Sequence, residues 1–224
     1  MASFPIRSAP PETAVPPGRI GYDLDAEVLL LHTIQTKAAF GELLSNGVLR
    51  PKPALADPWY FDAYHWMNRM MAARLPTSGN AALWLWARIR RRDLVDDCRY
   101  GRGQVLLVCR IPRVRVLLSH YIEWHSALNS HVAVPKLPGE SNEAFGTRWK
   151  RICDRFDNRR QAADAAASPV HRWPKELRDE VERSWECVFD RTYFSAKNQS
   201  GRPTAKAVAH PRSVRIPQTL SPGD

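Results

Sequence analysis

The chain lacks the features of a secreted, disulfide-stapled or membrane-spanning protein. Its four cysteines (Cys98, Cys109, Cys153 and Cys187) lie far apart and form no Cys-x-x-Cys pair. We therefore expect neither a disulfide framework nor a zinc ribbon, and we expect the thiols to be reduced and buried. No apolar run approaches the roughly 20 residues that a membrane helix needs, and the first 21 residues contain no apolar stretch of signal-peptide length. We expect a cytoplasmic protein without a membrane partner.

What the chain does contain is globular in composition. Of its 224 residues, 44% are hydrophobic and 25% charged, which is enough to build one domain with a sizeable core. Five prolines precede residue 18, so we predict a disordered leader over residues 1–21. A single domain then covers residues 22–217, and residues 218–224 form a flexible tail. The oligomeric state stays open.

The formal net charge is +10. An excess of this size attracts polyanions, whether nucleic acid or a nucleotide ligand, through counterion release. The alternative is that the arginines serve only solubility. Composition alone does not separate the two.

The apolar patterns predict an α+β fold with a central, mostly antiparallel split sheet flanked by helices. Strands are predicted over residues 26–34, 82–90, 104–111 and 114–119, with one more short strand within 205–216. Helices are predicted from Thr36 to Gly47, from Asp57 to about Pro76, over 142–161, and from Pro174 onward. The stripe of the second helix includes Trp59, Ala63, Trp66 and Met67. Residues 93–103 are expected to form a polar loop.

The first strand ends in His32-Thr33, which places a titratable ring and a hydroxyl at a strand end. Such a histidine can bind a ligand hydroxyl or transfer a proton. The alternative is a half-buried histidine with its polar groups satisfied inside the protein, which is the commoner case for a lone histidine.

The pattern His32-Thr33, followed by Leu43-Leu44-Ser45-Asn46-Gly47-Val48-Leu49-Arg50-Pro51, resembles the opening motif of the ADP-ribosyltransferase superfamily. The chain is also similar, over roughly residues 28–190, to a bacterial domain of unknown function, the one numbered 3841. The matching segments are Thr33–Gln35, Ala63–Met67, Leu83–Trp86, Leu117–Ser119 with Trp124-His125 and Leu128-Asn129, and Ser184–Glu186 with Phe189-Asp190.

The transferase resemblance implies a protein that binds NAD and transfers ADP-ribose to a nucleic acid or protein acceptor. It implies that His32, Thr33 and Arg50 bind NAD and that Tyr64 lines the pocket. Cleavage of the nicotinamide bond develops oxocarbenium character, which a positioned carboxylate stabilises. The last predicted strand carries no glutamate, which leaves Glu123 and Glu186 as candidates for that carboxylate.

The competing interpretation is a non-catalytic basic module that binds nucleic acid or a nucleotide. Exposed Trp84 and Trp86 could stack single-stranded bases beside nearby arginines, although burial is commoner for tryptophan. The arginines proposed to contact phosphates are Arg88, Arg90, Arg91 and Arg92, and, on the 142–161 helix, Arg148, Arg151 and Arg155. Charged side chains on a helix more often only cover its solvated face.

A second group of titratable residues is His120, His125 and His131 with Glu123. Spacings of five and six residues do not bring side chains together on a helix as spacings of three or four do. We therefore predict no metal site there, and a helix that Trp124 and Leu128 anchor to the core.

Overall fold

The computed structural model of the chain describes residues 19–21, 24–77, 81–100, 103–190, 205–209 and 214–215. The strands are β1 (Arg19–Gly21), β2 (Val28–Thr36), β3 (Val48–Leu49), β4 (Leu83–Arg90), β5 (Gln104–Pro112), β6 (Val116–His120), β7 (Ala205–Ala209) and β8 (Val214–Arg215). The α-helices are α2 (Lys37–Asn46), α3 (Phe61–Arg74), α4 (Arg91–Tyr100), α5 (Tyr121–Leu128), α6 (Asn142–Ala162) and α7 (Lys175–Trp185). Short 3₁₀ turns are η1 (Pro53–Leu55), η2 (Pro58–Tyr60), η3 (Arg113–Arg115), η4 (Val170–Arg172) and η5 (Glu186–Phe189).

The strands form a six-stranded sheet in the order β5-β2-β4-β7-β6, with β1 paired to the end of β4. A separate two-stranded sheet joins β3 to β8. Every pairing is antiparallel, so the predicted α+β fold with a mostly antiparallel sheet is confirmed. The sheet takes in residues 19–21 of the predicted leader. The rest of that leader and the predicted tail lie outside the described residues.

The single short strand predicted within residues 205–216 is two strands in the structure. The first, β7, lies between β4 and the edge strand β6. Its register sets Lys206 opposite Trp86 on one side and Ser119 on the other. The C-terminal part of the chain thus completes the sheet that the earlier strands begin.

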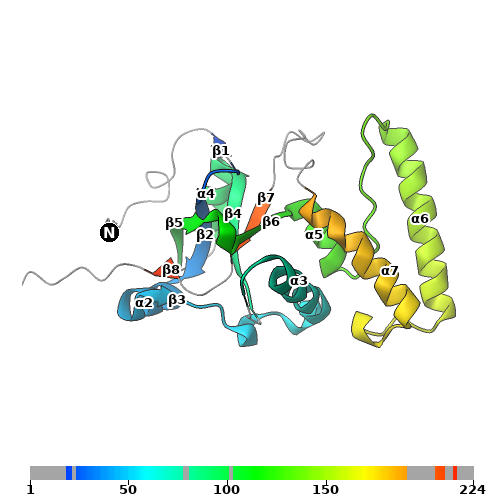
Figure 1. Ribbon diagram of the computed structural model, residues 1–224, viewed down its shortest axis with the longest axis horizontal. Coiled ribbons are helices and arrows are strands. Elements are labelled where there is room, and N and C mark those ends of the chain that lie inside the picture. Colours follow the sequence, from blue (N-terminus) through cyan, green and yellow to red (C-terminus); the bar gives the residue numbers. More distant parts are fainter. Residues whose placement is uncertain are drawn as a thin grey trace, which may run out of the picture.

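Successive side chains of a strand point to opposite faces of a sheet, and here both faces carry a core. On one face, Leu29, Leu31 and Leu85 pack with Leu43 of α2 and Leu49 of β3. On the other face, Trp84 and Leu117 pack against the helices α3, α5 and α7. Figure 1 shows the sheet and α2 on one side of the molecule and these helices on the other.

The predicted capping signals locate α2 and α6, whereas the predicted helix start at Asp57 is the 3₁₀ turn η2, and α3 begins only at Phe61. The Thr36 side chain accepts a hydrogen bond from the backbone N–H of Ala39, as an N-cap does. Gly47 ends α2 with a φ of 66°, in the left-handed region where glycine avoids the penalty of a Cβ. The helix predicted over 142–161 is α6, and Ser141 caps it through a hydrogen bond from Ala144.

The polar loop predicted over 93–103 is wrong, because residues 91–100 form α4. Leu94, Val95 and Cys98 recur at helical spacing and are buried, the first two against Ile89 of β4. Three aspartates make this stretch polar, and polar composition favours a loop. The three buried residues nevertheless form a short apolar stripe, and the burial of this stripe stabilises the helix.

The helical layer is built around tryptophan. Trp66 stacks on Trp124 at 6.4 Å between ring centroids and meets Trp185 edge-on at 5.4 Å, and all three are buried. By contrast, α6 lies at the outer edge of the molecule (Figure 1), and its one fully buried side chain is Phe156. A long helix held at the edge exposes most of its surface.

Candidate functional site

His32 is part of the core. Its register sets it opposite Val108 of β5 and Trp86 of β4, and its exposed fraction is 0%. Burial lowers the pKa of the imidazole from 6.5 to about 4, because the charged form loses its hydration. At neutral pH the ring is therefore uncharged, and it presents no atom to solvent.

The hydroxyl of Thr33 forms hydrogen bonds within the sheet. Its Oγ1 donates to the backbone carbonyl of Trp84 at 2.9 Å and accepts from Nε2 of Gln35 at 2.7 Å. The side chain is 2% exposed. The hydroxyl therefore links β2 to β4 and is occupied by protein partners.

Tyr64 lies beside this link and packs into the tryptophan core. Its ring centroid is 6.4 Å from that of Trp84 and 6.1 Å from that of Trp124. Burial, followed by the carboxylate of Asp57 and the ring of Tyr60, raises its pKa above the usual value. Trp84 thus joins the two predicted site residues, through a hydrogen bond to Thr33 and through ring packing with Tyr64.

The two candidate carboxylates occupy different environments. Glu123, in the first turn of α5, is half-buried, and burial raises its pKa. Its backbone N–H donates to Nδ1 of His120 at 3.3 Å. Burial, with a smaller contribution from Glu123, raises the pKa of the Cys187 thiol to about 12, so this cysteine is not an activated nucleophile.

Glu186 and Arg50 do not join this group. Glu186 is exposed and pairs with Arg74 at 3.6 Å. Arg50, which follows β3, is exposed as well. The structure therefore brings Thr33 and Tyr64 close to Trp84 but does not assemble the full set of predicted NAD-binding residues at one solvent-facing pocket.

The basic run over residues 88–92 is divided between the strand β4 and the helix α4. Arg88 and Arg90 lie at the end of β4, whereas Arg91 and Arg92 begin α4. Arg88 is half-buried, and Nε of Arg92 lies 3.6 Å from Asp93. The side chains of Arg90 and Arg91 lie outside the described set. The tryptophans beside them are packed, because Trp84 contacts Trp124 and Trp86 contacts Tyr121.

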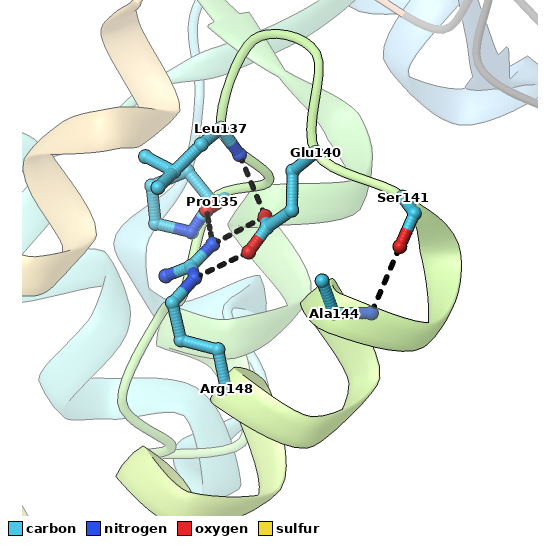
Figure 2. A network of polar contacts seen from close by, with 6 residues as sticks. All are labelled: Pro135, Leu137, Glu140, Ser141, Ala144 and Arg148. Carbon is cyan, nitrogen blue, oxygen red and sulfur yellow. Dashed lines mark hydrogen bonds and ion pairs between the residues drawn. The ribbon is translucent and has the colours of Figure 1, made fainter.

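Arg148 has a structural role (Figure 2). Its guanidinium donates to both carboxylate oxygens of Glu140, at 2.7 and 2.8 Å, and to the carbonyl of Pro135 at 2.7 Å. The same carboxylate accepts the backbone N–H of Leu137 at 3.0 Å. These hydrogen bonds, that of Arg148 first, lower the pKa of Glu140 to about 2. We call this network the Glu140 clamp, since it fixes the segment before α6 to the helix.

The other basic residues of α6 divide into paired and unpaired ones. Lys150 pairs with Asp154, Arg159 with Glu180 of α7, and Arg160 with Asp157. Arg151 and Arg155 are exposed and make no ion pair within the part of the chain that the structure describes. One helical turn apart, they lie on the same side of the helix. Among the predicted phosphate-binding residues whose side chains the structure describes, these two are exposed and make no ion pair.

One exposed feature was assigned wrongly from the sequence. Trp59, predicted to belong to the core stripe of a helix, is 84% exposed and lies in η2 before α3 begins. Phe61, the first residue of α3, is 59% exposed. Asp57 caps η2 by accepting a hydrogen bond from the backbone N–H of Trp59, so the stripe predicted from this point begins before the α-helix does.

Among the described residues, no three His, Cys, Asp or Glu side chains lie close enough together to hold a metal ion. His120 caps α5, whereas the side chains of His125 and His131 are exposed. Nor does the described part contain a helix with the length and apolar character that crossing a membrane requires.

Comparison with known proteins gives one match. Residues 30–205 match the family described as "Domain of unknown function (DUF3841)". Searches of curated proteins and of solved structures find no significant match. Because the matched region includes most of the chain, from β2 into the start of β7, the protein belongs to the DUF3841 family.

Proposed function

We propose that the protein is a non-catalytic module that binds nucleic acid through the outer surface of α6. The observation that carries this proposal is the pair Arg151 and Arg155, both exposed and without an ion-pair partner in the described structure. Solvated guanidinium groups are well suited to contact phosphate oxygens. The net charge of +10 supports a polyanionic partner.

The position of the two arginines adds to the argument. Four other basic residues of α6 are held by carboxylates, and their charge is largely neutralised locally. Arg151 and Arg155 keep theirs on a long, exposed helix at the edge of the molecule (Figure 1), where a nucleic acid strand meets no steric obstacle from the sheet. Surface charge that is not paired within the protein is what an anionic partner neutralises.

The proposal is tested by fluorescence anisotropy with labelled oligonucleotides over a series of salt concentrations. The logarithm of the affinity should fall linearly with the logarithm of salt concentration. The double variant Arg151→Gln/Arg155→Gln should reduce the magnitude of this slope by about 1.4 to 1.8, since each lost phosphate contact accounts for about 0.7 on single strands and 0.9 on duplex DNA.

The matched control is Lys150→Gln/Arg159→Gln. It removes the same number of charges from the same helix, but from residues that pair with Asp154 and Glu180. This control should keep a slope close to that of the unmodified protein. Equal effects of the two double variants, or binding that salt does not weaken, would contradict the proposal.

NAD binding and ADP-ribosyl transfer, with His32, Thr33, Arg50 and Tyr64 around the nucleotide and Glu123 or Glu186 as the carboxylate, stay a prediction. The burial of His32 and the internal hydrogen bonds of Thr33 lend this function less support than α6 lends to nucleic acid binding.

A further inference from the structure

The apolar stripe of α6 contains one large side chain that the rest of the described structure leaves half uncovered. Residues three and four apart lie on one side of a helix, and Phe145, Trp149, Ile152 and Phe156 follow this spacing. Phe156 is buried, and Phe145 and Ile152 are partly buried against the core. Trp149 belongs to the same stripe but is 48% exposed. An indole that stays half in water on an apolar stripe indicates a surface for a partner.

The exposed indole lies next to a position that has no side chain. Gly146 precedes Trp149 by about one helical turn and is itself exposed. A Cβ atom built on Gly146 would meet no other atom within 4 Å, so the surface at this point is open. The helix therefore presents a bulky ring and a flat position side by side, and these two shapes are able to pack against each other.

This open side of α6 has the spacing of a coiled-coil seam. Two apolar seam positions of a coiled coil are separated alternately by three and four residues. The same alternation relates the successive positions Asn142, Gly146, Trp149 and Cys153. The first three are exposed and Cys153 is half-buried. We call these four residues the α6 seam. Its spacing fits a second helix laid along α6.

Two opposite charges lie beside the α6 seam. Glu143 and Lys150 are seven residues apart, which places them on the same flank of the seam, and both are exposed. Glu143 makes no ion pair within the described part of the chain, and Lys150 pairs with the exposed Asp154 of its own helix, a contact that adds little stability. Flanking charges of this kind set the orientation in which two helices associate.

We propose that two copies of this chain associate through antiparallel α6 helices, with Trp149 of each copy packed over Gly146 of the other. In this register Lys150 of one copy lies only two residues, or about 3 Å along the axis, from Glu143 of the other. A second copy is the occupant that fits, because a twofold interface requires one surface that is complementary to itself. The ring, the flat position and both charges all lie on one such surface.

This association leaves the proposed nucleic acid surface accessible. Arg151 and Arg155 follow Trp149 by two and six residues, which places them largely on the other side of the helix from the seam. Because α6 lies at the outer edge of the molecule (Figure 1), the rest of the chain does not separate two copies that meet there. The dimer presents both pairs of arginines. The inference does not depend on what these arginines bind.

The test is sedimentation velocity of the full-length protein over a range of roughly 1 to 200 µM, which covers the affinities expected of a small interface. The unmodified protein should change from monomer to dimer as its concentration rises. Gly146→Leu fills the flat position and should weaken association at least about tenfold, as should Trp149→Ala. Trp59→Ala, at a tryptophan that is 84% exposed elsewhere, is the matched control and should dimerise as the unmodified protein does.

Gly146→Leu also separates loss of association from loss of folding. Leucine favours a helix more than glycine does, and its Cβ at this position meets no other atom, so the urea midpoint of the monomer should not fall. A charge exchange tests the register. Glu143→Lys should weaken the dimer, because it sets two cations against each other, and Glu143→Lys/Lys150→Glu should restore it.

Three results would overturn the proposal. The first is an unmodified protein that stays monomeric throughout the concentration range. The second is a dimer that forms equally well in Gly146→Leu and Trp149→Ala, since the interface then lies elsewhere. The third is a charge exchange that fails to restore association, which excludes the antiparallel register.

Discussion

The buried histidine of β2 should make the stability of the fold depend on pH between neutral and mildly acidic conditions. In the folded protein the pKa of His32 is about 4, because burial removes the hydration of the charged ring. In the unfolded chain the ring returns to its ordinary value of 6.5. Below pH 6.5 the unfolded chain therefore binds a proton that the folded protein does not, and the free energy of unfolding falls.

The size of this effect follows from linkage between the two pKa values. Lowering the pH from 7 to 5 should remove about 2 kcal/mol of stability through His32 alone, and the full loss, reached below pH 4, is roughly 3 kcal/mol. The variant His32→Leu places an apolar side chain of similar size at this position, and this side chain cannot titrate. The loss of unfolding free energy between pH 7 and pH 5 should therefore be about 2 kcal/mol smaller in this variant than in the unmodified protein.

Urea unfolding at pH 7 and pH 5, followed by the fluorescence of the eight tryptophans, measures both differences. His131→Leu is the matched control, since its exposed side chain stays in water when the chain folds. This control should show the same pH dependence as the unmodified protein. If His32→Leu also loses as much stability between pH 7 and pH 5 as the unmodified protein, the reasoning from burial is refuted.

Two further predictions concern the Glu140 clamp and NAD. Glu140→Gln should destabilise the protein and speed amide exchange before α6. Because the folded pKa is depressed to about 2, the carboxylate's contribution is complete above its ordinary pKa of 4.5 and is lost as the pH falls toward 2. Hydrogen exchange at neutral pH checks this, with the exposed Glu143→Gln as control, and equal exchange in both variants would contradict it. If the protein is the non-catalytic module proposed above, adding NAD should leave the melting temperature unchanged, since His32 and Thr33 face no solvent. A saturable rise that His32→Ala abolishes would instead support the transferase interpretation.

The features that the sequence predicted well depend on residues close together in the chain. The N-cap at Thr36, the helix stop at Gly47 and the start of the last helix at Pro174 are set by local geometry, and each is where the pattern places it. Strand existence also follows from short apolar runs. These signals require no knowledge of what the element packs against.

The errors arise where neighbours distant in the chain decide the outcome. Leu94 and Val95 of α4 belong to a cluster against which Ile34 of β2 and Leu106 of β5 pack, and the polar residues around them give no sign of these partners. Arg159 pairs with Glu180, which is 21 residues away, whereas Arg155 makes no ion pair among the described residues. No spacing rule predicts this difference between the two arginines. The complete burial of His32 depends on strands from three parts of the chain.

The arrangement of the two cores decides where a ligand can bind. Both faces of the six-stranded sheet are packed, one against α2 and β3 and the other against α3, α5 and α7. A polar residue in the middle of such a strand is therefore drawn into hydrogen bonds of the sheet, as Thr33 is, or neutralised by burial, as His32 is. Arg151 and Arg155, on which the proposed function rests, lie instead on the helical side and are exposed. Under the proposed function, the sheet serves as a scaffold, and recognition falls to a helix on its far side.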